Sequence, residues 1–230
     1  MSGSWEILEA RRNRVCMAVI SRAGYKVSKK WADAYRQLAL PDQSQIVEAQ
    51  GAPYDAARNA AAKTCVDGGF GYLFFLDTDT IPNSDTVIKL IETGRDLIGA
   101  IYRRRYPPYD IVGATAVLDA TGQVVGVPIK NDRSGEIVPV DFLPTGATLI
   151  SRRCLEAMFA SFPRPYAWGL DVAPVPDGAG GFLPQVSEDY VFSLRAKQIG
   201  FQPWIHTGLW CRHEVDGVIA GPNGAEYGGG

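Results

Sequence analysis

Hydrophobic and polar residues divide the first half of this chain into alternating strands and helices. Residues 15–21 form a near-continuous apolar run that is too short for a helix and is typical of a buried parallel strand. Residues 27–38 place Trp31, Ala34 and Tyr35 at helical spacing, which predicts an amphipathic helix. The same reading predicts further strands at 45–50, 72–76 and 97–102, and helices at 54–66 and from Asn83 or Ser84 to Glu92. This order indicates an α/β fold with a parallel sheet and right-handed crossovers.

The second half of the chain has a different pattern. Residues 112–127 alternate around Ala120-Thr121-Gly122, which predicts a β-hairpin. Residues 162–185 are rich in proline and glycine and predict a long irregular loop, of a kind that often covers or binds a ligand. The remaining elements are expected to be strands at 142–150 and 203–211, a short helix at 152–159, and a helix at 188–199 that Ser187 begins and Gly200 ends.

Composition and charge narrow the function classes. The chain has 230 residues, of which 46% are hydrophobic and 21% charged, as in ordinary globular proteins. Its 23 basic and 25 acidic side chains give a net charge of −2, which argues against a protein whose main work is to wrap nucleic acid. No CxxC pair occurs among the four cysteines, so the sequence offers neither a zinc knuckle nor a redox motif, and we expect buried, reduced thiols. With no long apolar segment and no signal peptide, we expect a soluble, cytoplasmic protein.

Two carboxylates follow directly on the strand at 72–76. Asp77 and Asp79 sit where an open α/β sheet binds ligands, at the carboxyl end of a strand. Such a pair can share a divalent cation, although Asp and Thr are also ordinary turn residues. The apolar strand that runs straight into this pair favours a metal or phosphate role.

Further candidates carry two interpretations each. Glu188 and Asp189 in the first turn of a helix fit the helix dipole, but they also fit a general base that faces the long loop. His213, after the last predicted strand, is either structural or a third ligand of an ion such as manganese. Four other groups are either solvated or packing residues, or contacts for an anionic ligand or for a sugar or base: Arg58-Asn59, Arg103-Arg104-Arg105, Tyr166 and Trp168.

Taken in order over residues 14–213, these features resemble the nucleotide-sugar-dependent glycosyltransferases of the GT-A fold, especially family 2 and small transferases such as mannosylglycerate synthase. The resemblance rests on an ordered set of segments: Val15 to Ser21 as the first nucleotide-binding strand, Arg58-Asn59, Leu76-Asp77-Thr78-Asp79 as the DxD motif, Thr145-Gly146-Ala147 with 149–153 on the acceptor side, Ser187-Glu188-Asp189 as the ED helix, and His213 as the C-terminal metal histidine. The loop at 162–185 departs most from that family, so the acceptor is not carried over.

The resemblance implies a GT-A fold with a mixed central sheet and a metal-dependent transfer of a sugar from a nucleoside-diphosphate sugar, such as a UDP- or GDP-sugar. Asp77, Asp79 and His213 would hold Mn²⁺ or Mg²⁺ against the diphosphate, with Asp79 preferred as the direct ligand. The remaining implied roles are contacts to the nucleoside by Ser21, Arg22 and Gln50, to the diphosphate by Arg58, and deprotonation of the acceptor hydroxyl by Asp189 beside Glu188.

The resemblance also implies domain boundaries and binding partners. Residues 1–216 are expected to form one domain, with a nucleotide-sugar-binding half at 12–110 and an acceptor half at 111–216, before a flexible Gly-rich tail at 217–230. The acceptor could be a small molecule, a glycan, a protein or a modified nucleobase. Membrane insertion is not expected.

Two alternatives come from other classes. Asp77-Thr78-Asp79-Thr80 also fits the signature of haloacid-dehalogenase-like phosphatases, with Asp77 as nucleophile and Asp79 as general acid. Lys130 or Lys197 would be the phosphate lysine, and Glu188-Asp189 the distal magnesium acids. That signature usually belongs to a strand near the N-terminus, whereas two strand–helix units precede it here. The other alternative is a module that binds a nucleotide or sugar without turning it over. Asp189 distinguishes the readings, because such a module has no need of a base.

Overall fold

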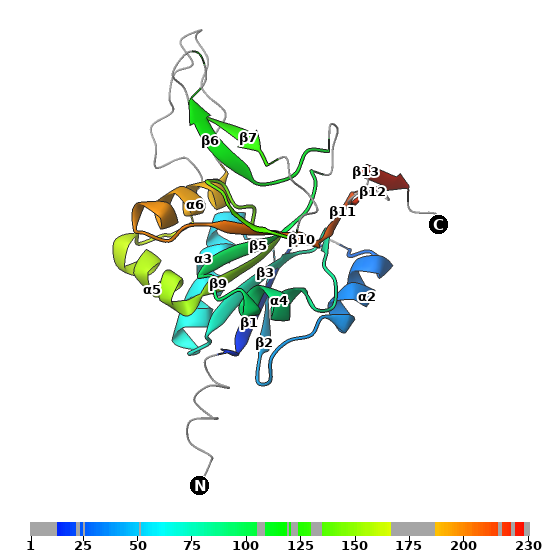
Figure 1. Ribbon diagram of the computed structural model, residues 1–230. Helices are drawn as coiled ribbons and strands as arrows, with labels where there is room; N and C mark the ends of the chain where they lie inside the picture. The colour runs from blue at the N-terminus through cyan, green and yellow to red at the C-terminus, as the bar shows by residue number, and fades with distance from the viewer. Residues whose placement is uncertain are drawn as a thin grey trace.

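A mixed β-sheet with helices on both faces forms the centre of this computed structural model (Figure 1). The structure describes residues 13–21, 24, 26–50, 52–104, 109–118, 120, 124–129, 135–166, 187–215, 218–221 and 224–227. Among them, seven strands pair in the order β2-β1-β3-β9-β5-β10-β8. These are β1 (Val15–Ser21), β2 (Gln45–Gln50), β3 (Tyr72–Asp77), β5 (Leu97–Ile101), β8 (Ile137–Pro139), β9 (Ala147–Ser151) and β10 (Trp204–Trp210). The predicted α/β class with a mixed central sheet is confirmed.

Strand β9 interrupts the parallel order expected for the first half of the chain. β1 pairs in parallel with both β2 and β3, as predicted. β9 then lies antiparallel between β3 and β5, so these two strands are not neighbours. Only the second part of the strand expected at 142–150 belongs to this ladder, and Phe142 instead forms an isolated bridge with Ala114. A short apolar strand can pair in the parallel or the antiparallel direction. The sequence therefore did not show that β9 lies antiparallel between β3 and β5.

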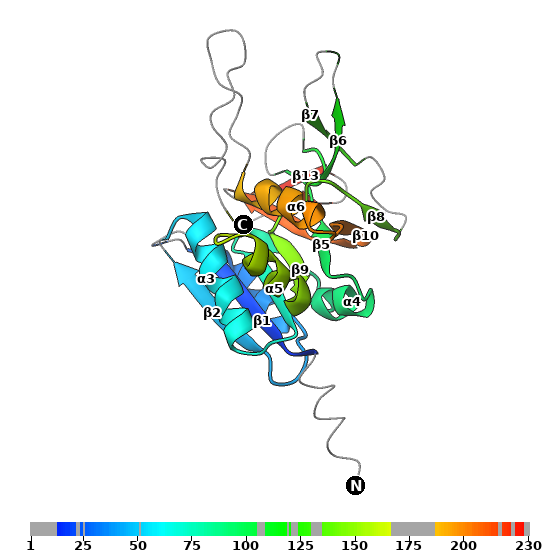
Figure 2. The same cartoon turned by 90° about the vertical axis from the view of Figure 1, so that its left-hand side faces the viewer.

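Each face of the sheet has its own hydrophobic core, because successive side chains of a strand point to opposite sides. Cys16 and Ala18 of β1 pack with α3, α5 and α6, which Figure 2 shows on one side of the sheet. Met17 and Val19 pack on the other side with α2 and α4. The helices are α2 (Lys29–Gln37), α3 (Tyr54–Asp67), α4 (Thr86–Glu92), α5 (Arg152–Ser161) and α6 (Glu188–Gln198). α3 and α6 belong to the same layer, so both helices cover the same face of the sheet.

The ends of the helices follow their sequence signals only in part. The Ser28 hydroxyl caps α2 by accepting a hydrogen bond from the Trp31 N–H at 3.0 Å. α4 begins after Asp85 rather than after Asn83 or Ser84, with no side-chain cap. Ser187 precedes α6 as predicted, yet its hydroxyl donates to the Asp189 carboxylate and caps no backbone N–H of the helix. Gly94 and Gly200 end their helices with positive φ, +64° and +91°, as glycines at this position do.

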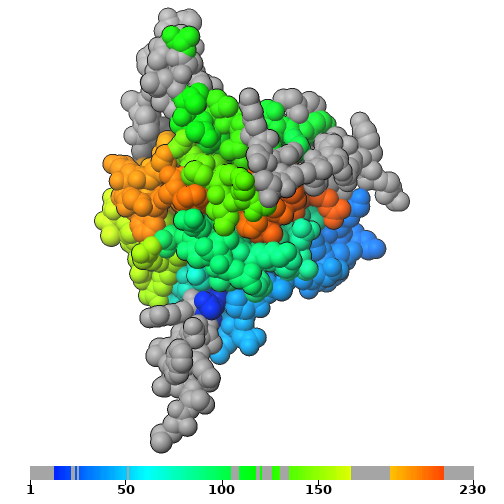
Figure 3. Space-filling view, in the orientation of Figure 1, coloured from blue at the N-terminus to red at the C-terminus, as the bar shows by residue number. Residues whose placement is uncertain are grey.

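Two smaller sheets stand beside the central one. β6 (Ala114–Leu118) and β7 (Val124–Pro128) form the predicted hairpin, which projects from the body of the molecule (Figures 1 and 3). β4 (Thr80–Ile81), β11 (Arg212–Val215), β12 (Val218–Gly221) and β13 (Gly224–Tyr227) form the other, in the order β13-β12-β11-β4. Residues 218–221 and 224–227 pair as β12 and β13, so their backbone groups have partners, and the flexibility expected from residue 217 stays a prediction.

The four cysteines match the expectation of buried, reduced thiols. Cys16, Cys65, Cys154 and Cys211 are buried free thiols. None of the described helices combines the length and the hydrophobicity needed to cross a lipid bilayer. The assignment of 1–216 to one domain with halves at 12–110 and 111–216 stays a prediction.

Candidate active site

Several predicted residues end at one edge of the central sheet. Ser21 and Gln50 are the last residues of β1 and β2 and face each other in the ladder. Asp77, the last residue of β3, pairs with Ile20 one position earlier. The structure therefore brings these three residues to the carboxyl-terminal edge of parallel strands, where α/β sheets bind ligands. Arg22, expected beside them, lies outside the described residues.

Arg58 of α3 is clamped between two carboxylates that are distant in sequence. Its Nη2 donates to Asp77 Oδ1 and Oδ2 at 3.1 and 3.2 Å, and its Nε donates to Glu188 Oε1 at 3.2 Å. Only 4% of the Arg58 side chain is exposed. Burial alone lowers the pKa of Arg58, but the charges of Asp77 and Glu188 outweigh it and raise that pKa above its usual value. A permanent cation thus joins the end of β3 to the start of α6.

Asp79 and His213 form a second pair at this edge. Asp79 Oδ2 lies 3.3 Å from His213 Nε2, and both side chains are mostly buried. The small ladder of β4 and β11 creates the contact, because Thr80 pairs with His213 and the Glu214 N–H donates to the Asp79 carbonyl at 2.8 Å. The sequence separates these residues widely, and backbone pairing brings them together.

A backbone carbonyl places a proton on one nitrogen of the His213 ring. Its Nδ1 lies 2.8 Å from the Arg103 carbonyl oxygen, which can only accept a hydrogen bond, so Nδ1 carries a proton. In the neutral ring, Nε2 then presents a lone pair toward a carboxylate oxygen, an arrangement that a shared cation or a second proton would satisfy. Within the part of the chain that the structure describes, no group of three or more His, Cys, Asp or Glu side chains is arranged to hold a metal. Asp79 pairs with His213, and Asp77 pairs with Arg58.

The start of α6 places two more carboxyls beside Arg58. Burial raises the pKa of Glu188, and the charge of Asp189 raises it further against the opposing effect of Arg58. Burial also raises the pKa of Asp189, although Ser187 and Arg58 act in the other direction. The Ser187 hydroxyl and the Tyr190 N–H both bond to Asp189 Oδ1, so neither engages Oδ2. Burial raises the pKa of Asp77, Arg58 acts in the other direction, and the charges of Asp79 and, more weakly, Asp189 raise it further.

We expect the substitution Glu188→Gln to flatten the pH dependence of stability. The pKa of Glu188 is raised in the folded state, so the folded protein holds more protons than the unfolded one above the ordinary Glu pKa, and stability falls as pH rises. A glutamine oxygen can still accept from Arg58 Nε without this loss. Urea denaturation at pH 5, 6, 7 and 8 should show the variant gaining about 1 kcal/mol on the wild type across the range. Parallel curves for the two proteins would contradict the raised pKa.

Three residues to which no role in the site was assigned from the sequence, Ser28, Trp31 and Tyr102, support it. Trp31 Nε1 donates to the Asp77 carbonyl at 3.0 Å, and Ser28 Oγ donates to Glu214 Oε2. Tyr102 OH accepts from the Gly146 N–H at 2.9 Å, and its ring packs edge-on against His213 with centroids 5.3 Å apart. A side chain on Gly146 would place Cβ 2.6 Å from Tyr102 OH, so this position has room only for glycine. Of these residues, only Tyr102 could have been proposed as a site residue from the sequence, because it ends the strand predicted at 97–102.

Other candidates have structural roles. Asn59 exchanges hydrogen bonds with the backbone of Tyr166 at 2.7 and 2.9 Å and so anchors the beginning of the long loop, and the Tyr166 ring stacks on Phe192. Arg103 donates to the Tyr109 carbonyl at 3.0 Å and lies over the Trp210 ring. Trp168, Arg105 and Lys130 lie outside the described residues, as does most of the loop at 162–185. Lys197 pairs with Asp141.

Comparison with known proteins shows a likeness in structure. No protein-family model matches this chain, and no curated protein matches it in sequence. The crystal structure of A197 from STIV is similar, with a TM-score of 0.61 and 15% identity over 94% of this chain and 95% of that one. TarS 1-349 from S. aureus, in complex with UDP-GlcNAc, gives a TM-score of 0.46 and 13% identity over 84% of this chain and 55% of that one. The 4-diphosphocytidyl-2C-methyl-D-erythritol synthase from Anaerococcus prevotii DSM 20548 gives 0.42 and 10% over 83% and 99%. The likeness to A197 spans nearly all of both chains and shows that the two share a fold.

Proposed function

We propose that this chain is a metal-dependent glycosyltransferase of the GT-A type, a hexosyltransferase that uses a UDP- or GDP-sugar. One observation carries the proposal. The acidic segment after β3, His213 of β11 and the Glu188-Asp189 pair of α6 converge at one edge of the sheet, with Arg58 between them. This combination offers a place for a charged diphosphate and a base near it.

Within this proposal, the chain's own residues bind the donor along the sheet edge. Ser21 and Gln50, adjacent in the β1–β2 ladder, would contact the nucleoside. Arg58 would stabilise the diphosphate through Nη1, which is buried and has no partner among the described residues. Asp77 would be held in place by Arg58 and would contact the donor from the end of β3.

Asp79 and His213 would hold Mn²⁺ or Mg²⁺, since such ions commonly take one or two protein donors and complete their coordination with substrate phosphates and water. When bound, the cation neutralises charge on the departing nucleoside diphosphate. The Arg103 carbonyl orients the histidine ring for this task by accepting from Nδ1.

Asp189 would act as the base. Its Oδ1 is held by Ser187 and Tyr190, while Oδ2 can accept the proton of an acceptor hydroxyl. Burial raises the pKa of Asp189 toward the working range of a general base. Glu188, which bonds to Arg58, would keep α6 oriented. The acceptor would be a small molecule, a glycan, a protein or a modified nucleobase.

Calorimetry with UDP, GDP, CDP and dTDP tests the proposal, first with Mn²⁺ and then with EDTA. We expect one nucleotide to bind in the presence of Mn²⁺, and its affinity to fall at least tenfold in EDTA and in Asp79→Asn, because the ion links the protein to the phosphates. Asp67→Asn is the control, since Asp67 is exposed and pairs with Lys63 at the far end of α3.

Two results would count against the proposal. If no nucleotide binds and the protein instead hydrolyses a simple phosphate ester, the phosphatase reading of Asp77 and Asp79 replaces it. If a nucleotide binds equally well in EDTA and in Asp79→Asn, the cation has no part in donor binding.

A further inference from the structure

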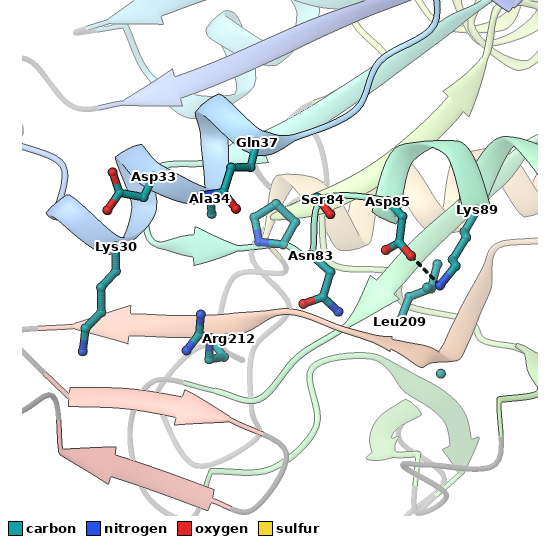
Figure 4. Close-up of a pocket in the computed structure, with 12 residues that line it drawn as sticks. Lys30, Asp33, Ala34, Gln37, Asn83, Ser84, Asp85, Lys89, Leu209 and Arg212 are labelled. Carbon is teal, nitrogen blue, oxygen red and sulfur yellow. Dashed lines mark ion pairs between the residues drawn. The ribbon is translucent and has the colours of Figure 1, made fainter.

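A polar cavity lies on the side of the β4–β11 ladder away from the candidate active site. Its volume is about 650 Å³, within the usual range of small-molecule sites. α2 forms one wall, the segment from Pro82 to the start of α4 forms another, and β10 with β11 closes the third side (Figure 4). Lysine, arginine, amide and hydroxyl groups line it, so it suits a polar ligand.

The charges in this cavity are not balanced. Asp85 pairs with Lys89 at 2.6 Å, and Asp33 pairs with Arg36 at 3.3 Å. Arg36 lies outside the lining, and Asp33 is at the same end as Lys30 in Figure 4, so the lining carries three cations, Lys30, Lys89 and Arg212, against the two carboxylates. Lys30 and Arg212 are exposed, and neither makes an ion pair with any residue that the structure describes. Figure 4 shows both of these cations at the end of the pocket away from the Asp85–Lys89 pair. An excess of positive charge is thus concentrated in one part of a concave surface.

The neighbouring groups select for hydroxyls as well as for charge. Gln37, Asn83 and Ser84 also line the cavity, and their side chains can donate to and accept from sugar-type hydroxyls. Arginine can grip two oxygens of one phosphate, and lysine adds a point charge to the same group.

β11 separates this cavity from the acidic strand end. Successive residues of a strand point to opposite sides, so Arg212 lines the cavity while its neighbour His213 contacts Asp79. α2 likewise contributes Lys30 to the cavity and Trp31 to the Asp77 carbonyl. The cavity is therefore distinct from the donor site, but it shares two supporting elements with it.

We propose that this cavity binds a phosphorylated sugar or polyol, with Arg212 and Lys30 on the phosphate and the amides and hydroxyl on the carbon chain. Such a molecule could be an acceptor with an anionic group or an effector of the proposed reaction. The binding itself does not depend on the proposed function.

Calorimetry in EDTA and without nucleotide tests this site with three probes: glucose 6-phosphate, inorganic phosphate and glucose. We expect glucose 6-phosphate to bind with a Kd of about 1 mM, phosphate more weakly and glucose more weakly still. Arg212→Gln and Lys30→Gln should each raise the Kd of glucose 6-phosphate roughly three- to tenfold, as the loss of one charged contact does. Lys63→Gln, which removes an exposed cation on α3, should leave it unchanged.

The outcomes separate this proposal from that of the donor site. Weaker binding in Arg212→Gln and Lys30→Gln, with no change in Asp79→Asn, supports it even if no nucleotide binds. No binding of glucose 6-phosphate at about 20 mM overturns it. The same holds if Lys63→Gln or Asp79→Asn weakens binding as much as the two cavity variants do. To distinguish the two sources, glucose 6-phosphate is added to a donor turnover assay, where a glycosylated product marks an acceptor and a changed rate without one marks an effector.

Discussion

Replacing Arg58 with methionine should lower the free energy of unfolding by about 3–5 kcal/mol at pH 7.5. The substitution keeps most of the buried volume but leaves Asp77 and Glu188 facing each other without their cation. The loss should shrink at pH 5, because burial already raises the pKa of both carboxyls and protonation then relieves the unpaired charges. Urea denaturation at the two pH values measures both effects.

A matched surface variant makes this test specific. Arg36 and Asp33 also form an ion pair, but their side chains are 73% and 46% exposed, so Arg36→Met should cost less than about 0.5 kcal/mol. Arg58→Lys provides an intermediate case, since one ammonium cannot make both contacts in the same geometry. If Arg58→Met and Arg36→Met lower the free energy of unfolding by the same small amount, the ion pairs of Arg58 with Asp77 and Glu188 contribute no more than a surface pair. If Arg58→Met does not fold, the comparison of Arg58→Lys with Arg36→Lys decides the question.

Asp189→Asn should reduce sugar transfer to water by about 10²–10⁴-fold and leave nucleotide affinity within about twofold. The side chain keeps its size and its Oδ1 can still accept from Ser187 and Tyr190, while the group that takes the proton is gone. The rate of nucleoside-diphosphate release from the donor in the absence of acceptor gives the first quantity, and calorimetry gives the second.

Asp67→Asn is the control here as well, and it should match the wild type in both measurements. A loss of nucleotide affinity in Asp189→Asn equal to its loss of rate would assign this residue to binding. Retained turnover would remove the base and leave a different group to accept the proton.

The sequence was informative about the candidate site where function and secondary structure coincide. The end of β3 could be located from the sequence because the strand before Asp77 and Asp79 is apolar. Since α/β sheets bind ligands at the carboxyl ends of their strands, this position made both residues candidates for the site. Glu188 and Asp189 stand at a helix start with a clear cap residue. The resemblance predicts that Arg58 contacts the diphosphate, and that role stays a prediction; its two ion pairs depend on α3 and α6 meeting, which residue spacing does not encode.

The remaining parts depend on tertiary pairing. β4 has two residues and β8 has three, too few for periodicity to show. The glycine-rich residues near the C-terminus did not predict β12 and β13. A strand that gains its stability from pairing with a neighbour needs few apolar residues of its own. Trp31 was assigned to the hydrophobic side of its helix, correctly, but its indole N–H has a second role that only the fold reveals.

The insertion of β9 has a consequence for the order in which the chain folds on the ribosome. When residues 1–110 have emerged, β3 has β1 on one side but lacks its other neighbour, and β5 lacks both, since β9 and β10 are still to be synthesised. Open strand edges and the apolar faces of β3 and β5 are then exposed together, as in the intermediates that chaperones bind. The central sheet can therefore be completed only after β9 and β10 have been synthesised.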